Sequence, residues 1–333
     1  MESKLNLKDI CQDIRSYAGV LRKNPIGDVF ARLQNTHVYG SPLPNFGDDA
    51  AIIPWDGKYL LFAADGMMIK LLLYEPYAAG KAAVMVTVND IYSMGGRPLG
   101  MVNVLASGEI EQRDQIVQGI EKGCHKLNVP MLGGHLHPDA EKDHPSLSVA
   151  ILGWSNDLIR SHLAVPGDHL MLAVDLNGRV GCWSVISWDA NSGKNSKELL
   201  RRLNVLPLLA ERKIVNAGKD ISNAGILGTL AIMMENSGQG AIVDIRSLPK
   251  PTHLDISDWL MCFQSYGFVL SVPAEYSKLV ASLFEEVEIT ATVVGIVTKE
   301  QKVILRHGAE EEVLFDFEKE LITGIKKDKD VNI

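Results

Sequence analysis

Residues 80–106 read GKAAVMVTVNDIYSMGGRPLGMVNVLA and decide the architecture of the first half of the chain. Alanine and valine dominate the beginning of this stretch, and their spacing predicts a helix over Tyr77–Met94. The glycine pair that follows ends the helix, and an apolar strand is predicted at Met101–Leu105. The stretch therefore predicts a mostly apolar helix that leads through a tight turn into a buried strand.

Asp90 does not fit this apolar helix. It lies on the last turns, where the helix dipole is negative and a carboxylate is unfavourable by up to about 1 kcal/mol. For a single Asp near a helix end, capping or exposure to solvent is the plainer interpretation. If Asp90 has a function, we expect a positive group beside it.

Composition bounds the class of protein. The 333 residues suit two domains of roughly 150 residues each. Hydrophobic residues make up 46% and charged residues 22%, and no apolar run approaches the ~18 residues that span a bilayer, so no membrane partner is expected. The net charge of -8 argues against a nucleic-acid partner, because such binding depends largely on Lys and Arg.

The amino terminus and the cysteines predict a cytoplasmic location. The first residues, MESKLNLKDICQDI, lack the basic start and apolar core of a secretory signal. No C-x-x-C pair occurs, so neither a disulfide framework nor a zinc cage is indicated. We expect reduced, buried thiols at Cys11, Cys124, Cys182 and Cys262.

Three segments are predicted. Residues 1–35 form a helical segment, residues 36–155 a first mixed-sheet domain and residues 156–333 a second one, so the fold class is α+β (α/β). In the second domain we expect helices near 199–216, 226–234 and 274–285, and strands at 169–174, 241–245, 266–271, 290–297, 302–306 and 312–316.

A hairpin in the first domain gathers acidic residues. Strands are predicted at Asp49–Pro54 and Tyr59–Ala64, and the Asp-Gly between them is a strong hairpin signal. Asp48 and Asp49 stand at the entrance of the first strand and Asp65 at the exit of the second. Because the strands are antiparallel, we expect these positions near one edge.

A further strand of the first domain is predicted to end at a glycine pair. Val129–Leu132 is the strand, Gly133-Gly134 ends it, and a polar loop with three histidines follows. A transition-metal site is the sharper interpretation of this loop, and plain surface histidines are the more frequent one. The histidines are His135, His137 and His144.

Residues 220–225, DISNAG, precede the apolar helix Ile226–Met234. Ser222 or Asn223 is a natural N-cap for this helix. Contact with a phosphate or carboxylate at the helix N-terminus is the functional alternative.

Four carboxylates end apolar elements of the first domain: Asp48, Asp49, Asp65 and Asp90. Such charges repel one another where they converge, unless a cation lies among them. Magnesium prefers oxygen ligands and bridges carboxylates to substrate phosphates. The set therefore indicates a magnesium site, which Gly-rich turns with exposed N–H groups could complete for an anion.

These residues carry a resemblance over most of 46–154. The segments FGDDAAIIP, LLFAADG, AAGKAAVMVTVNDIYSMGGRPLGMVNVLA, MLGGH and LSVAILGW resemble the superfamily of aminoimidazole ribonucleotide (AIR) synthetase, thiamine-monophosphate kinase, selenide water dikinase and the hydrogenase maturation dehydratase. The second half is similar through PGDHLMLAVDLNG, KDISNAGILGTLAIMMENSGQGAIVDI and VVGIV.

The resemblance implies ATP and Mg²⁺ bound near the interface of a homodimer, in which the N-terminal sheets of two subunits pair into a barrel. It implies that Asp48, Asp49, Asp65 and Asp90 bind or orient metal, with Asp48 and Asp90 as the catalytic pair. Residues implied near the nucleotide are Gly47, Lys81, Asn89, Gly133, Gly134, His135, Asp220, Ser222 and Asn223.

Departures from the family narrow the chemistry. His135 stands where many members have an acid, and the second Asp of the kinase pattern Asp-x-Ser-Asp-Gly is absent after Ser222. The Gly-Gly-Glu-Asp of the kinases is replaced at residues 264–267, and the reactive cysteines of the selenide and hydrogenase branches are missing. The chain most resembles an AIR synthase-related branch that includes proteins named methanogenesis marker 2.

Two hypotheses follow. The first is a magnesium-dependent, ATP-binding enzyme that phosphorylates or dehydratively activates a small metabolite, as a phosphotransferase or a cyclo-ligase-like enzyme. The alternative is a nucleotide- or metabolite-binding protein of the same fold without turnover.

Overall fold

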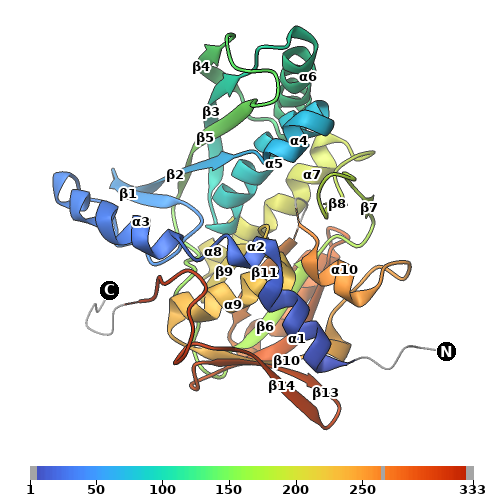
Figure 1. The fold of residues 1–333 in the computed structure, drawn as a ribbon. Coiled ribbons are helices and arrows are strands. Elements are labelled where there is room, and N and C mark those ends of the chain that lie inside the picture. Colours follow the sequence, from blue (N-terminus) through green and yellow to red (C-terminus); the bar gives the residue numbers. More distant parts are fainter. Residues whose placement is uncertain (1–5, 264–266, 328–333) are drawn as a thin grey trace.

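The computed structural model describes residues 6–263 and 267–327 (Figure 1). These residues form two mixed α+β domains, as the sequence predicts, one on a five-stranded sheet and one on a seven-stranded sheet. The five-stranded sheet is open, so no barrel closes within this part of the chain. Residues 264–266, where the kinase motif is replaced, lie outside the described residues.

The five-stranded sheet has β5 at its centre. Neighbouring strands of this sheet pair antiparallel, except β3 and β4, which pair in parallel. In spatial order the strands are β1 (Ala51–Trp55), β2 (Lys58–Gly66), β5 (Ser146–Ser155), β3 (Arg97–Ala106) and β4 (Met131–His137). The helices of this domain are α4 (Ile69–Tyr74), α5 (Pro76–Ser93) and α6 (Ile110–Leu127).

The predicted hairpin is confirmed. β1 and β2 are joined by Asp56 and Gly57, which have φ angles of 47° and 73°. Two successive positive φ angles define the type I′ turn that Asp-Gly favours between twisted strands.

The predicted end of β4 is wrong. The strand runs through Gly133 and Gly134 to His137, so His135 and His137 lie on a strand and not in a loop. β4 is an edge strand that pairs in parallel with β3, from Val102–Gly133 to Ala106–His137. Ladder hydrogen bonds need no side chain, so the glycines weaken the strand without ending it.

The seven-stranded sheet packs around α9 (Gly225–Ser237), whose 13 residues are all buried. In spatial order its strands are β14 (Glu310–Asp316), β13 (Lys302–His307), β10 (Gly240–Asp244), β12 (Thr290–Thr298), β6 (His169–Val174), β11 (Gly267–Val272) and β9 (Ala217–Asp220). The other elements are β7 (Arg179–Val180), β8 (Trp188–Asp189), α7 (Ser196–Leu203), α8 (Val205–Arg212), α10 (Ile256–Met261) and α11 (Ser277–Glu285).

The helix predicted over 199–216 is two helices. α7 ends at Leu203, Asn204 follows, and α8 starts at Val205. Pro207 lies in the first turn of α8, where a missing N–H costs nothing, whereas it would remove a bond inside one continuous helix.

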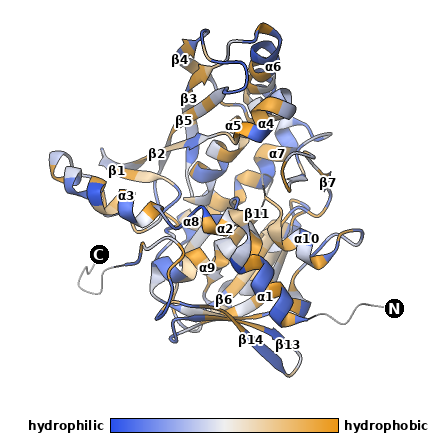
Figure 2. Ribbon diagram, viewed as in Figure 1, coloured by the Kyte–Doolittle hydropathy of each residue, from blue (hydrophilic) through white to orange (hydrophobic). Residues whose placement is uncertain are grey.

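The amino-terminal segment has two parts. α1 (Leu7–Ser16) and α2 (Ala18–Leu21) pack on the second domain, where Arg15 donates hydrogen bonds of 2.6 Å to the carbonyls of Val313 and Leu314 in β14. α3 (Ile26–Leu33) continues into a 3-10 helix at Gln34–Tyr39, has no buried residue and projects from the molecule in Figure 1. Its exposed residues are both hydrophilic and hydrophobic (Figure 2).

Within residues 6–263 and 267–327, no helix combines the length and apolar character needed to cross a membrane. All four cysteines are free; Cys11 and Cys262 are buried as predicted, and Cys124 and Cys182 are only half-buried.

Candidate functional site

A cavity of about 380 Å³ lies where both domains and the amino-terminal segment meet. Its charged lining residues are Asp48, Asp49, Asp65, Asp90, Asp220, Lys23 and Lys219, and we call it the acid cavity. The sequence therefore predicted four of its acids as a set, and the second domain supplies the fifth.

Four different elements position the acids. Asp49 lies two residues before the start of β1, and Asp65 is the last residue but one of β2. Asp90 lies in the last turn of α5, and Asp220 ends β9 of the other sheet. Because the carboxylates come from both domains, the cavity exists only when the two domains are packed together.

Lys219 is the positive group beside these acids. Its side chain is 9% exposed and forms an ion pair with Asp49, and its Nζ donates a 2.7 Å hydrogen bond to the carbonyl of Gly47. Asp49 also accepts hydrogen bonds from Ser93 Oγ at 2.7 Å and from the Asp220 backbone N–H at 3.1 Å. Burial lowers the pKa of Lys219, but Asp49 and Asp220 outweigh it and raise the pKa overall. Lys219 therefore stays charged and holds the Asp49 carboxylate in place through their ion pair.

Asp65, Asp90 and Asp220 lie in surroundings that disfavour the ionised form of a carboxyl group. Burial raises the pKa of Asp65, and it raises the pKa of Asp90 and Asp220 well above the ordinary value. Like charges add to the rise: Asp220 and then Asp65 act on Asp90, and Asp49 acts on Asp220. A bound cation would favour the charged forms of all three carboxylates.

Asp48 has a different environment. Its carboxylate accepts hydrogen bonds from Arg160 Nε at 2.8 Å, Arg160 Nη2 at 2.6 Å and the Ser161 N–H at 2.7 Å, and His162 Nδ1 lies 3.6 Å away. Burial acts to raise the pKa of Asp48, but its contacts with His162 and Arg160 prevail and lower the pKa to about 2. One carboxylate oxygen is thus taken by the buried ion pair with Arg160 and the other by the Ser161 N–H, and both contacts join Asp48 to the chain that enters the second domain.

The loop after β9 adds polar groups to the acid cavity. Neither Ser222 nor Asn223 caps α9, whose N-cap position is Ala224, so the capping prediction is wrong. The chain instead turns at Gly225, whose φ is +75°, and the Gly225 N–H bonds to the Ser222 carbonyl at 2.9 Å. Ser222 and Asn223 line the cavity, and Asn223 Oδ1 is buried with no hydrogen-bond partner among the described residues.

The donor set of the acid cavity fits magnesium. Carboxylate and amide oxygens are its preferred ligands, and magnesium keeps several waters and bridges one or two carboxylates to phosphates. Within the described ranges, the one group of three acidic or histidine ligands within 4.8 Å of one another is the exposed set Glu141, Asp143 and His144. The acids of the cavity are spaced more widely, which suits an ion that also binds water and a phosphate.

The remaining residues implied by the resemblance fall in three places. Gly47 and Asn89 line the acid cavity. Lys81 lines another cavity and donates a 2.9 Å hydrogen bond to Ser192 Oγ. Gly133 and Gly134 lie on β4, away from the acid cavity.

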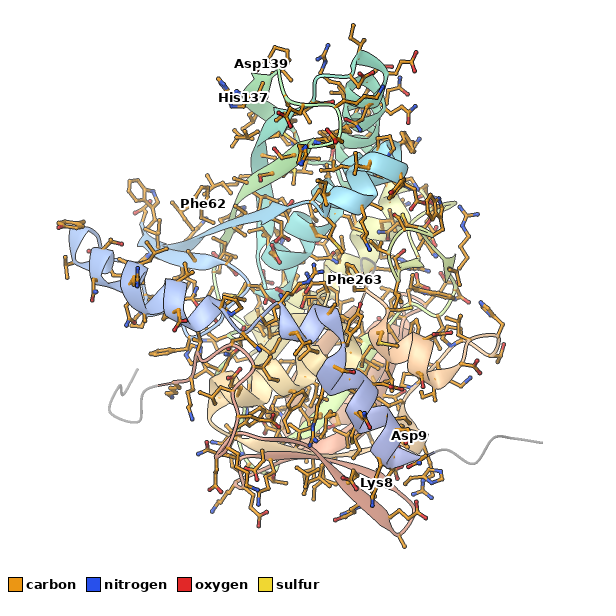
Figure 3. All side chains as sticks on the ribbon, viewed as in Figure 1. Lys8, Asp9, Phe62, His137, Asp139 and Phe263 are labelled. Carbon is orange, nitrogen blue, oxygen red and sulfur yellow. The ribbon has the colours of Figure 1, made fainter. Side chains whose placement is uncertain are left out.

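The histidines of β4 also lie away from the acid cavity. In Figure 3, His137 is at the far end of the first domain from Phe263, which lines the cavity. The rings of His135 and His137 lie edge to face with their centroids 4.5 Å apart. His144 Nδ1 instead lies 3.3 Å from a carboxylate oxygen of Glu141 and 3.3 Å from one of Asp143. The three histidines do not converge.

Sequence reasoning missed three positively charged residues that contact or line the acids of the candidate site: Lys23, Lys219 and Arg160. Lys219 carried a signal: it adjoins Asp220, which the resemblance implies near the nucleotide, and a lysine buried there needs an acidic partner. Lys23, between α2 and α3, and Arg160, in an irregular segment, gave no comparable pattern.

Family comparisons agree with this architecture. The model of the AIR synthase related protein N-terminal domain matches residues 47–155, and that of the C-terminal domain matches residues 166–308. The chain therefore belongs to the AIR synthase related family. An uncharacterised protein of Methanocaldococcus jannaschii is 38% identical over 96% of this chain and 100% of its own length. One from Synechocystis is 35% identical over 97% and 99%.

Solved structures share the fold. T. maritima PurL complexed with ATP superposes with a TM-score of 0.75 at 16% identity and covers 96% of this chain and 53% of its own. This chain thus spans about half the length of that PurL. AaThiL complexed with AMPPCP and TMP has a TM-score of 0.64 at 18% identity, over 87% of this chain and 97% of its own.

Proposed function

We propose that the chain is a magnesium-dependent enzyme that binds ATP in the acid cavity and phosphorylates or dehydratively activates a small metabolite. One observation carries the proposal: Asp65, Asp90 and Asp220 converge from two domains with raised pKa values beside two lysines. A protein selected only for stability would not keep three such acids together. The complexes of T. maritima PurL with ATP and of AaThiL with AMPPCP support the choice of nucleotide.

Each charged group has a proposed role. Asp65, Asp90 and Asp220 would hold Mg²⁺, which neutralises phosphate charge when it is bound. Lys219 keeps Asp49 in place and brings a fixed positive charge to the cavity. Lys23 would contact phosphate, because its ammonium faces the cavity without an ion pair to any described carboxylate. Asp48, held by Arg160, would position the loop that carries Asp49.

A binding protein without turnover is the second candidate. The ion pair between Lys219 and Asp49 favours it, since it removes one of the predicted metal ligands. The missing second acid after Ser222 points the same way. Binding would then require fewer carboxylates than phosphoryl transfer does.

We also propose a homodimer. The side of the five-stranded sheet away from α5 and α6 exposes a row of apolar side chains, which we call the open face: Ile53, Phe62, Val102, Val104 and Leu152, each 37–49% exposed. Phe62 projects outward from β2 in Figure 3. A contiguous apolar face of this kind marks an interaction site, and a second copy of the same sheet would be complementary to it.

The free thiols support residence in the reducing cytoplasm.

ADP formation tests the proposal. The protein is incubated with ATP and Mg²⁺, with and without excess EDTA, and with an extract of small metabolites as the source of acceptor. We expect metabolite-dependent ADP formation that EDTA and Asp65→Asn abolish. Tight Mg–ATP binding without any ADP would establish the second candidate, and the absence of both would refute the two together.

A further inference from the structure

A second cavity, of about 320 Å³, lies at the other end of α5 and shares no lining residue with the acid cavity. Lys81 and Lys126 line it, and we call it the lysine pocket. The first half of α5 and the end of α6 form one wall, and the β7–β8 segment of the second domain forms the other. Its volume is within the range of small-molecule sites.

The floor of the lysine pocket is apolar. Side chains from both domains contribute to it: Ala78, Ala82, Met85, Leu127, Val180 and Leu199. Apolar walls with a few placed polar groups are what small organic ligands require, because the walls supply affinity and the polar groups fix orientation.

The two lysines carry positive charge, and their ammonium groups donate hydrogen bonds to neutral acceptors. Lys81 Nζ donates to Ser192 Oγ at 2.9 Å, and Lys126 Nζ donates to the Asn191 carbonyl at 2.7 Å. Both acceptors are neutral, and no carboxylate of residues 6–263 or 267–327 forms an ion pair with either ammonium. Burial lowers the pKa of Lys126, the charge of Lys81 adds to this, and the charge of Asp189 acts against it. The ammonium groups therefore repel each other in the absence of an anion.

The two acids that line the pocket, Glu75 and Asp189, accept hydrogen bonds from backbone N–H groups. Glu75 accepts from the backbone N–H groups of Trp183 and Ser184, at 3.3 and 3.0 Å. Asp189 accepts from the N–H of Ser192 at 2.8 Å and lies 3.7 Å from Arg179 Nη2. Backbone donors thus hold both carboxylates against the β7–β8 segment. The charge of Asp189 still acts on both lysines, but it forms no ion pair with either, so the two ammonium groups can contact a ligand.

We propose that the lysine pocket binds an organic phosphate, a phosphoryl group joined to an apolar ring or chain. Two ammonium groups that form no ion pair with a described carboxylate match a dianion, and the apolar floor matches the body of such a molecule. The site is independent of the function proposed for the acid cavity. Because α5 lines both cavities, the helix that carries Asp90 in the acid cavity also carries Lys81 in the lysine pocket.

Calorimetry with phenyl phosphate in metal-free buffer tests the proposal. Without metal, the acid cavity repels anions, so binding there does not interfere. We expect saturable binding of one phenyl phosphate per chain, weaker binding of inorganic phosphate and none of benzyl alcohol. The variant Lys81→Gln/Lys126→Gln should bind at least about tenfold more weakly, as expected for the loss of one charge-assisted hydrogen bond.

Two controls keep the test decisive. Lys81→Arg/Lys126→Arg keeps both charges and should retain saturable binding, and Asp90→Asn, in the other cavity, should bind like wild type. If the glutamine variant does not fold, Ala82→Leu fills the pocket from α5 and should abolish binding instead. Absence of saturable binding to the wild type, or equal binding by a folded glutamine variant, would overturn the proposal.

Discussion

Asp220, at the end of β9, raises the pKa of Asp90, at the end of α5, across the boundary between the two domains. Burial is the larger cause of the rise, and Asp65 and Asp49 add to it. The domains therefore pack together at a point where their charges oppose packing. This arrangement weakens the ligand-free protein, and the cation of the proposed function would relieve the repulsion.

Replacing Asp90 with Asn should stabilise the ligand-free protein at pH 7. The amide keeps the shape of the carboxyl group and cannot ionise, and each unit by which the pKa is raised corresponds to about 1.4 kcal/mol. Urea unfolding measures the difference, and Asp28→Asn, at an exposed acid on α3, is the control that should change stability little. A clearly less stable Asp90→Asn protein would contradict the burial of a charged acid there.

The pH dependence of stability has a defined sign. The folded-state pKa values of Asp65, Asp90 and Asp220 exceed the ordinary value of 3.8, so the folded state retains protons that the unfolded state loses. The contribution of these acids to the free energy of unfolding therefore falls as the pH rises from about 4 through the raised pKa values. Urea titrations at several pH values should show a shallower fall for Asp90→Asn than for wild type; identical profiles would argue against the coupling.

Asp48→Asn should have the opposite effect and destabilise the protein by about 3–5 kcal/mol, because it leaves the Arg160 guanidinium buried without its partner. The pKa of about 2 means that the stabilisation by the Asp48 charge is complete above pH 3.8 and is lost as the pH falls through about 2. The matched control is Asp157→Asn, whose partner Lys213 is 77% exposed, and its cost should be at most about 1 kcal/mol. Equal losses in the two variants would refute the structural role of Asp48.

Local signals predicted much of the fold. The Asp56-Gly57 turn and the helix ended by its glycine pair both depend on residues close in sequence. The glycines of β4 misled the prediction because the strand is held by its neighbour β3, which sequence spacing does not reveal.

The candidate site was predictable only in part, for a similar reason. Asp49, Asp65 and Asp90 end apolar elements of one domain, and that pattern is visible in the sequence. The partners that determine their states, Lys219 and Asp220, lie more than a hundred residues further along the chain and reach the cavity through domain packing. The same packing commits Asp48 to Arg160, a role that spacing could not separate from metal binding.

Phe62→Glu should convert the proposed dimer to a monomer. A charge at the centre of the open face would be buried without a partner in the dimer and harmlessly exposed in the monomer. Light scattering after size exclusion measures the mass, and Ile110→Glu, on α6 and 72% exposed, is the control that should leave the dimer intact. A wild-type protein that is monomeric at high concentration would contradict the proposal.

Calorimetric titration of the wild-type protein with AMPPCP, with and without Mg²⁺, tests the central claim most directly. The account predicts saturable binding of one nucleotide per chain that requires Mg²⁺ and is lost in Asp90→Asn while that variant remains folded. Binding that is equally strong without Mg²⁺, or unchanged in Asp90→Asn, would contradict a magnesium–triphosphate site in the acid cavity.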